Sequence, residues 1–154
     1  MGFIGIFVLD YLVLYGLYFT LPDEILTHYI YYYGIVHTAR QIVQEIAPLD
    51  AVSAFDNVLY SPRATLEIVR GCDGSGVMFL LVAAIAAYPS AWRGKIIGIL
   101  SAIVLTCVLN QARIVGLYFT LTRQPDWFIA LHTYLVPTLF VILAVGFFAT
   151  WASH

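Results

Sequence analysis

Long uninterrupted apolar runs constrain this chain more than any other feature of its sequence. Four of the runs approach or exceed the roughly 20 residues that a helix needs to cross a lipid bilayer. The expected spans cover approximately residues 3–21, 75–92, 96–121 and 127–151. Only 10% of the 154 residues are charged, whereas a soluble domain carries about 25%. The runs therefore predict an all-α integral membrane protein, a four-transmembrane-helix bundle that forms a single membrane domain over residues 1–154.

The charge balance and the length exclude several classes of function. The chain has 7 Lys and Arg against 9 Asp and Glu, so no basic excess is available to neutralise the phosphates of a nucleic acid. The spans leave no room for a large soluble catalytic domain. The first span lacks a basic segment before it and a small-residue cleavage site after it, which predicts an uncleaved anchor rather than a signal peptide. Any chemistry must take place in or on the bilayer.

The short loops predict how the chain is oriented. The turn Arg93-Gly94-Lys95 is the densest positive cluster at any expected helix end, and such clusters stay in the cytoplasm. Both termini are then cytoplasmic, and the loop over residues 22–74 faces outward. We therefore expect a multi-pass protein of the cytoplasmic (inner) membrane.

The extracytoplasmic loop has a composition that resembles a soluble protein. In residues 25–47, apolar and aromatic side chains recur at roughly helical spacing, which predicts an amphipathic interfacial helix. The positions assigned to its apolar face are Ile25, Tyr29, Tyr33, Val36, Val43 and Ile46. Residues 57–60 and 64–70 flank a Ser61-Pro62-Arg63 turn, and this pattern predicts a short hairpin.

A repeated hexapeptide indicates the depth of several polar residues in the membrane. Gly-Leu-Tyr-Phe-Thr-Leu occurs at residues 16–21 and again at 116–121, and both copies close a helix that runs outward. Superposing the copies puts Asp10 at the depth of Asn110. Arg113 then lies about one helical turn nearer the outer surface.

Three chemically competent side chains are expected at that outer depth. Cys72 precedes the second span, Arg113 lies in the third, and His132 lies in the fourth, about five residues from its outer end. Ionisable residues within spans normally face the bundle interior or water. Cys72 stands in a glycine-rich bend at a helix start, where amide dipoles stabilise a thiolate. A nucleophilic thiolate, an imidazole acid/base and a fixed cation that stabilises an oxyanion predict acyl transfer through a thioester.

Three neighbouring polar residues are candidates for supporting roles. Asp10 is a possible buried counter-charge for Arg113, and Asn110 shares its depth. Asp73 either places a carboxylate beside the thiol or caps the second span. Arg113 itself has two structural alternatives, namely pairing with Asp10 or extending outward to the headgroups.

Pro137 predicts a local opening in the fourth span. Proline has no N–H, so the backbone bond to the carbonyl of Thr133 is missing, one residue beyond His132. We expect the helix to be loosened where a substrate helix must approach.

The other candidate ligands and nucleophiles do not form a convincing site. Cys107 lies in the middle of a span, where we expect an unreactive packing residue that is not disulfide-bonded to Cys72. His28 and His37 are nine residues apart and lack the spacing of a zinc motif. We therefore expect no metal and no cofactor.

The combined pattern resembles the exosortase/archaeosortase family of membrane transpeptidases. The resemblance rests on Cys72-Asp73-Gly74 at a helix start, Asn110-Gln111-Ala112-Arg113 on the next helix and His132 on the one after. It implies a minimal four-helix member of that family. It also implies a cysteine protease (a hydrolase or acyltransferase) in which Cys72 is the nucleophile, Arg113 the oxyanion stabiliser and His132 the general acid/base.

The partner that the resemblance implies is a secreted, membrane-anchored protein. Its C-terminal sorting signal would contain a short motif, a transmembrane helix and a basic cluster, and would be cut at the outer face of the membrane. The acyl acceptor stays open between a lipid, a glycan and water.

Two other classes of function compete with this enzyme. One is a small membrane carrier or assembly subunit in which Asp10, Asn110, Arg113 and His132 form a buried polar relay. The other is a structural anchor that presents the outer loop, which leaves the depth of Arg113 unexplained. Replacing Cys72 by alanine separates the classes, because only thioester chemistry requires the thiol.

Overall fold

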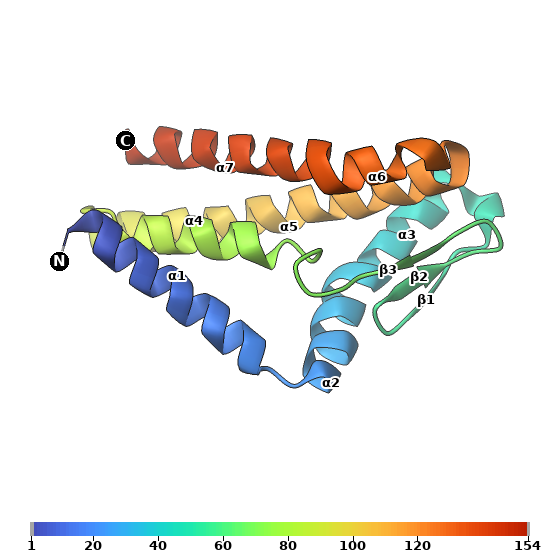
Figure 1. The fold of residues 1–154 in the computed structure, drawn as a ribbon, viewed down its shortest axis with the longest axis horizontal. Coiled ribbons are helices and arrows are strands. Elements are labelled where there is room, and N and C mark those ends of the chain that lie inside the picture. The colour runs from blue at the N-terminus through green and yellow to red at the C-terminus, as the bar shows by residue number, and fades with distance from the viewer. Residues whose placement is uncertain (1, 154) are drawn as a thin grey trace. The chain divides into compact units, whose positions relative to one another are not determined.

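The computed structural model describes residues 2–153, and most of them are helical (Figure 1). Three helical stretches in the described chain are long and apolar enough to cross a membrane by length and composition. They are α1 (Phe3–Thr20), α5 (Trp92–Arg123) and the stretch Pro125–Ala152. The protein is therefore an integral membrane protein of the all-α class.

The second expected span is shorter in the structure than the sequence predicts. The prediction covered residues 75–92, but helix α4 (Ser75–Ala87) has only 13 residues. At 1.5 Å per residue this is about 20 Å, less than the roughly 30 Å of a bilayer core. Tyr88 ends the helix with an extended backbone (ψ 136°) because it precedes Pro89, which disfavours helical geometry at that position.

The chain forms two compact units, each assembled from segments that are distant in sequence. The first contains α1, α4, the part of α5 up to Leu109, and α7 (Val136–Ala152) from Thr138 onward. Its helices are apolar on nearly all sides, as is typical of helices in lipid. α1 packs along α4 (Figure 1). The core of this unit contains the buried residues Leu81, Ile85, Ala102 and Ala144, with Val77, Ile99, Phe147, Phe148 and Trp151 packed against them.

The second unit begins with one continuous helix that changes its winding. α2 (Asp23–Ile25) leads into the π-helix η1 (Leu26–Val36), which continues as α3 (His37–Ile46). A π-helix repeats its bonds every five residues. Three of the four buried residues of η1, namely Leu26, Tyr31 and Val36, follow that spacing, and Ile35 is the fourth.

The predicted apolar face is only partly buried against the rest of this unit. The prediction assumed α-helical spacing throughout, and Val36 and Val43 are indeed buried. Tyr29 and Tyr33, which the prediction placed on the same face, are 63% and 59% exposed. The wider turn rotates the face of the helix that packs against the rest of this unit.

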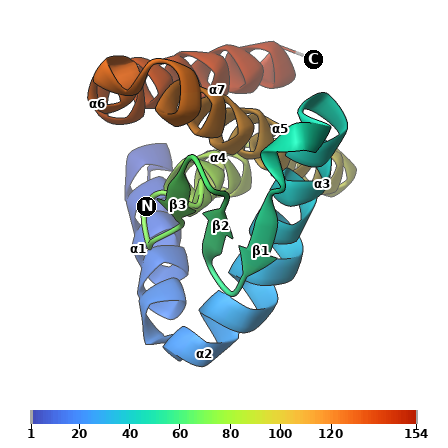
Figure 2. The ribbon, with the colours of Figure 1, turned by 90° about the vertical axis from the view of Figure 1, so that its right-hand side faces the viewer.

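A three-stranded antiparallel sheet follows the helix (Figure 2). The short 3-10 helix η2 (Pro48–Asp50) leads to β1 (Ser53–Phe55), and the sheet continues with β2 (Val58–Tyr60) and β3 (Thr65–Glu67) in that spatial order. The sequence predicts only a two-stranded hairpin, so β1 is an addition. β1 is three residues long, as are β2 and β3, and joins β2 through a two-residue turn.

The second unit closes with the C-terminal part of α5 and the segment that precedes α7. α5 contributes residues from Asn110 onward, followed by the 3-10 helix η3 (Pro125–Trp127), α6 (Phe128–Ala130) and the π-helix η4 (Leu131–Leu135). η4 lies directly before Pro137, whose missing N–H removes an α-helical bond. The structure has a π-helix here, a feature frequent at functional sites, and the local opening expected from Pro137 stays a prediction.

Candidate functional site

The backbone around Cys72 is held by a glycine and an arginine. Gly71 has a φ of 86°, a conformation that L side chains adopt only with strain. The Cys72 N–H donates to the carbonyl of Val69 at 2.9 Å and closes the turn. Arg70 Nη2 donates to the Leu21 carbonyl at 2.8 Å and pairs with Asp23 Oδ1 at 2.6 Å. These contacts fix the position from which the half-buried thiol projects.

The structure brings Cys72 together with His132, sixty residues later in the chain. The distance from Cys72 Sγ to His132 Nε2 is 3.7 Å, which is hydrogen-bond range for sulfur. His132 belongs to the π-helix η4, so the widened turn carries the imidazole. Proton transfer between the thiol and the imidazole needs no intervening group at this separation.

Arg113 reaches the same position from α5. Its Nη1 donates to the backbone carbonyl of Cys72 at 3.4 Å, and its charge acts electrostatically on His132. A guanidinium stays protonated at every physiological pH. The three side chains predicted to share a site, Cys72, Arg113 and His132, therefore lie together within the second unit.

The neighbouring residues on α5 show how this helix is anchored. Gln111 Nε2 donates to the carbonyls of Gly34 at 3.0 Å and Ile35 at 3.2 Å, both in the π-helix η1. Asn110 is only 3% exposed, and its Oδ1 has no hydrogen-bond partner among the described residues. The sequence identified Asn110 as a supporting candidate but gave no reason to connect Gln111 to η1.

The two carboxylates proposed as supporting residues occupy different settings. Asp73 is half-buried next to Cys72, and Gly74 occupies the N-cap position of α4, so the supporting role of Asp73 stays a prediction. Asp10 is a half-buried residue of α1 in the first unit. Its pairing with Arg113 stays a prediction.

Cys107, His28 and His37 lie outside this cluster. Cys72 and Cys107 are both free, and Cys107 is exposed on α5 rather than packed in a core as the sequence predicts. His28 Nδ1 lies 3.4 Å from Asp56 Oδ1 on the surface of the second unit, and His37 packs against Tyr32.

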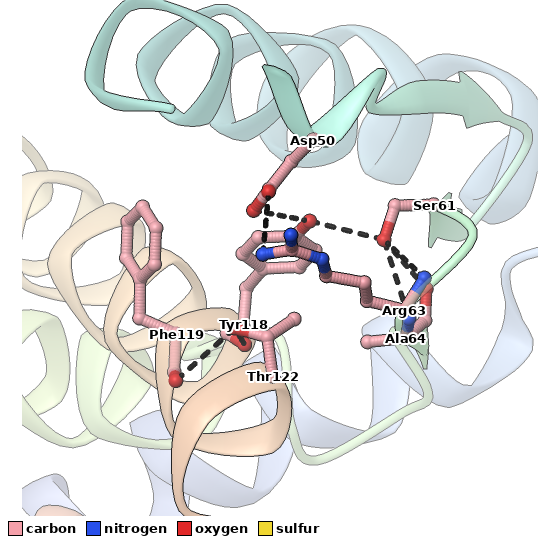
Figure 3. A network of polar contacts seen from close by, with 7 residues as sticks. All are labelled: Asp50, Ser61, Arg63, Ala64, Tyr118, Phe119 and Thr122. Carbon is pink, nitrogen blue, oxygen red and sulfur yellow. Dashed lines mark hydrogen bonds and ion pairs between the residues drawn. The ribbon is translucent and has the colours of Figure 1, made fainter. Parts of the chain in front are cut away.

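A network of polar contacts around the buried Tyr118 was not predicted (Figure 3). The hydroxyl of Tyr118, a fully buried residue of α5, donates to Asp50 Oδ2 at 3.2 Å and lies 3.0 Å from Ser61 Oγ. Asp50 Oδ1 pairs with Arg63 Nη1 at 3.1 Å. The network ties the β2–β3 turn to α5. The only sequence signal was Tyr118 in the repeated hexapeptide, where a tyrosine at the membrane interface explained it equally well.

Fold and site together define a class: a helical membrane protein in which a thiol, an imidazole and a guanidinium meet. Comparison with known proteins agrees with that class. The sequence model of the transmembrane exosortase family matches residues 7–149, so the chain belongs to this family.

One relative and one negative result complete the comparison. A probable archaeosortase E of Methanocaldococcus jannaschii is 31% identical to the chain over 121 residues, which are 76% of the chain. The chain covers 65% of the length of that relative. No solved structure matches the chain significantly.

Proposed function

We propose that this protein is a cysteine transpeptidase that cleaves C-terminal sorting signals of secreted proteins. The observation that carries the proposal is the 3.7 Å contact between Cys72 Sγ and His132 Nε2, with Arg113 bound to the carbonyl of the same cysteine. A nucleophile, a base within reach of it and a nearby fixed cation are the parts that acyl transfer requires.

The proposed first step forms an acyl-enzyme. His132 takes the thiol proton, and Cys72 Sγ attacks the scissile carbonyl of the sorting signal. The guanidinium of Arg113 stabilises the negative charge on the carbonyl oxygen. The C–N bond then breaks as His132 gives its proton to the leaving amine, and the S–C bond of a thioester remains.

The second step releases the acyl group. His132 removes a proton from the acceptor, which attacks the thioester carbonyl, and the proton returns to the sulfur as the S–C bond breaks. The acceptor is a lipid, a glycan or water. No metal or cofactor takes part in either step.

The proposal includes a single membrane domain with four crossings, the short α4 included, and a site facing outward. Both termini are then cytoplasmic. Reporter fusions should place residues near Asp50 outside and residues near Gly94 inside. An external Gly94 would move the site to the cytoplasmic side and contradict the cell-surface role, although not the grouping of the three residues.

The decisive experiment traps the thioester. The protein is co-expressed with a reporter that ends in a sorting signal encoded in the same genome, and acyl-enzyme is detected as a hydroxylamine-sensitive adduct on Cys72. Cys72→Ala and His132→Ala should abolish cleavage, whereas the matched control Cys107→Ala should retain it. A carrier or assembly subunit that works through a polar relay would lose little activity on Cys72→Ala. A Cys72→Ala variant that keeps its cellular function without cleaving the reporter would therefore favour that alternative.

A further inference from the structure

The strand that leads to Cys72 has an open edge. β3 is the last strand of the sheet, and within the described chain it pairs on one side only, with β2. The partners across that pair are Val58 with Glu67, Leu59 with Leu66, and Tyr60 with Thr65. An unpaired strand edge is a template for another extended chain.

The hydrogen bonds of the hairpin show which backbone groups face the open side. Ser61 N–H donates to the Ala64 carbonyl and Ile68 N–H to the Asn57 carbonyl, each at 2.8 Å. In an antiparallel pair, alternate residues direct both backbone groups at the partner. Ala64, Leu66 and Ile68 are therefore bonded toward β2. The N–H and C=O groups of Thr65 and Glu67 point to the open edge.

Both ends of this edge are held in place. Before the strand, the ion pair between Arg63 and Asp50 fixes the turn at 3.1 Å. After it, Asn57 Nδ2 donates to the Ile68 carbonyl at 2.9 Å, and Arg70 binds the Leu21 carbonyl. A strand that is fixed at both ends needs little ordering when a peptide binds it, and this favours affinity.

The edge is also close to the nucleophile along the chain. Glu67 and Cys72 are five residues apart, which limits their separation to roughly 17 Å even for a fully extended chain. The turn closed by the Cys72 N–H shortens that path further. A short extended peptide bonded to the edge could therefore also reach the thiol.

We propose that the open edge of β3 binds the extended segment of the sorting signal next to its scissile bond, as an added strand. This assignment rests on the function proposed above. The outward groups of Thr65 and Glu67 then bond to the peptide backbone. Main-chain bonding of this kind provides affinity without reading the peptide sequence. The side chains of Thr65 and Glu67 are not required.

The test removes one outward N–H and leaves the hairpin intact. Glu67→Pro deletes the N–H that faces the open edge, a position where proline is tolerated because no ladder bond is lost. Glu67→Ala is the matched control, since it removes the same side chain and keeps the N–H. Cleavage of the co-expressed reporter should fall about tenfold in Glu67→Pro relative to Glu67→Ala, through a higher KM, from the lost bond and the blocked approach. Alkylation of Cys72 by iodoacetamide should proceed at the same rate in both variants.

Cleavage at the wild-type rate by both variants would overturn the proposal. An equally reduced rate in both would also overturn it, because the side chain would then be the contact. If alkylation slows in Glu67→Pro, a synthetic peptide of the sorting signal decides instead. Replacing its amides by esters one at a time should slow cleavage at alternate positions, and a flat profile would overturn the proposal.

A wild-type dimer that Glu67→Pro dissociates without change in cleavage would assign the edge to a second copy. Persistent cleavage by Cys72→Ala would refute the thiol mechanism itself, which keeps the two failures apart.

Discussion

The ring of Phe128 lies parallel to the imidazole of His132, with 5.4 Å between the ring centroids and 5° between the planes. The two residues are about one helical turn apart, Phe128 at the start of α6 and His132 in the π-helix η4. His132 Nδ1 is buried and has no hydrogen-bond partner among the described residues. In many thiol or serine enzymes a third polar group orients the imidazole through this atom. Here the ring of Phe128 stacks on the imidazole, and we expect this contact to orient it.

Replacing Phe128 should therefore affect the chemistry without removing a reactive group. Phe128→Leu should slow reporter cleavage roughly two- to tenfold, because an aromatic pair contributes about 0.5–1.5 kcal/mol. Phe128→Tyr should restore the rate, since it keeps the ring. The pH profile of Cys72 alkylation should change in Phe128→Leu only. A wild-type rate and profile for the leucine variant would leave Phe128 with a packing role alone.

Replacing Arg113 by lysine distinguishes two roles for this residue, oxyanion stabilisation and charge pairing. Arg113→Lys keeps the charge but loses the planar, forked donors, so cleavage per unit of membrane-inserted protein should fall about 10²- to 10³-fold, as when an oxyanion donor is lost. If Arg113 only pairs with Asp10, the positive charge alone should suffice and Arg113→Lys should keep most of the cleavage. Near-normal cleavage by Arg113→Lys, together with an inactive Asp10→Asn, would contradict the oxyanion role.

The hydroxyl of Tyr118 should stabilise the second unit. Tyr118→Phe removes its bond to Asp50 and should lower the free energy of unfolding by about 1–3 kcal/mol, since a buried carboxylate loses a donor. Hydrogen exchange in the β2–β3 turn should accelerate, because this network ties the turn to α5. The control is Tyr29→Phe, at a position that is 63% exposed. Equal stability of the two variants in detergent would show that the network contributes nothing.

The turn before Cys72 should be sensitive to a single methyl group. Gly71 has a φ of 86°, and a Cβ added there would meet no atom within 4 Å, so the effect of Gly71→Ala is purely conformational. We expect a loss of about 1–2 kcal/mol in unfolding free energy, with slower reporter cleavage. Gly76→Ala, within helix α4, should instead stabilise the protein by roughly 0.5–1 kcal/mol. Thermal unfolding of both variants measures the contrast, and a neutral Gly71→Ala would exclude a strained turn.

Much of the membrane architecture could be predicted because hydrophobicity in lipid depends on local composition. The apolar runs identified α1, α5 and the stretch Pro125–Ala152 as helices of spanning length. The extent of α4 was overestimated, because Pro89 ends the helix although the apolar composition continues past it. The π-winding of η1 escaped prediction as well, because spacing rules assume a single helical period.

The sequence by itself determined which chemical groups this protein has: a thiol after a glycine bend, a guanidinium inside an apolar helix and an imidazole before Pro137. Each is recognisable alone, because a polar residue is costly in an apolar segment and therefore stands out. A shared depth for the three could be predicted, but only the tertiary structure decided which of their atoms meet. The 3.7 Å from Cys72 to His132 and the bond from Tyr118 to Asp50 join residues about sixty or more positions apart. Such contacts depend on how helices and turns pack against one another, and no local pattern of residues encodes that packing.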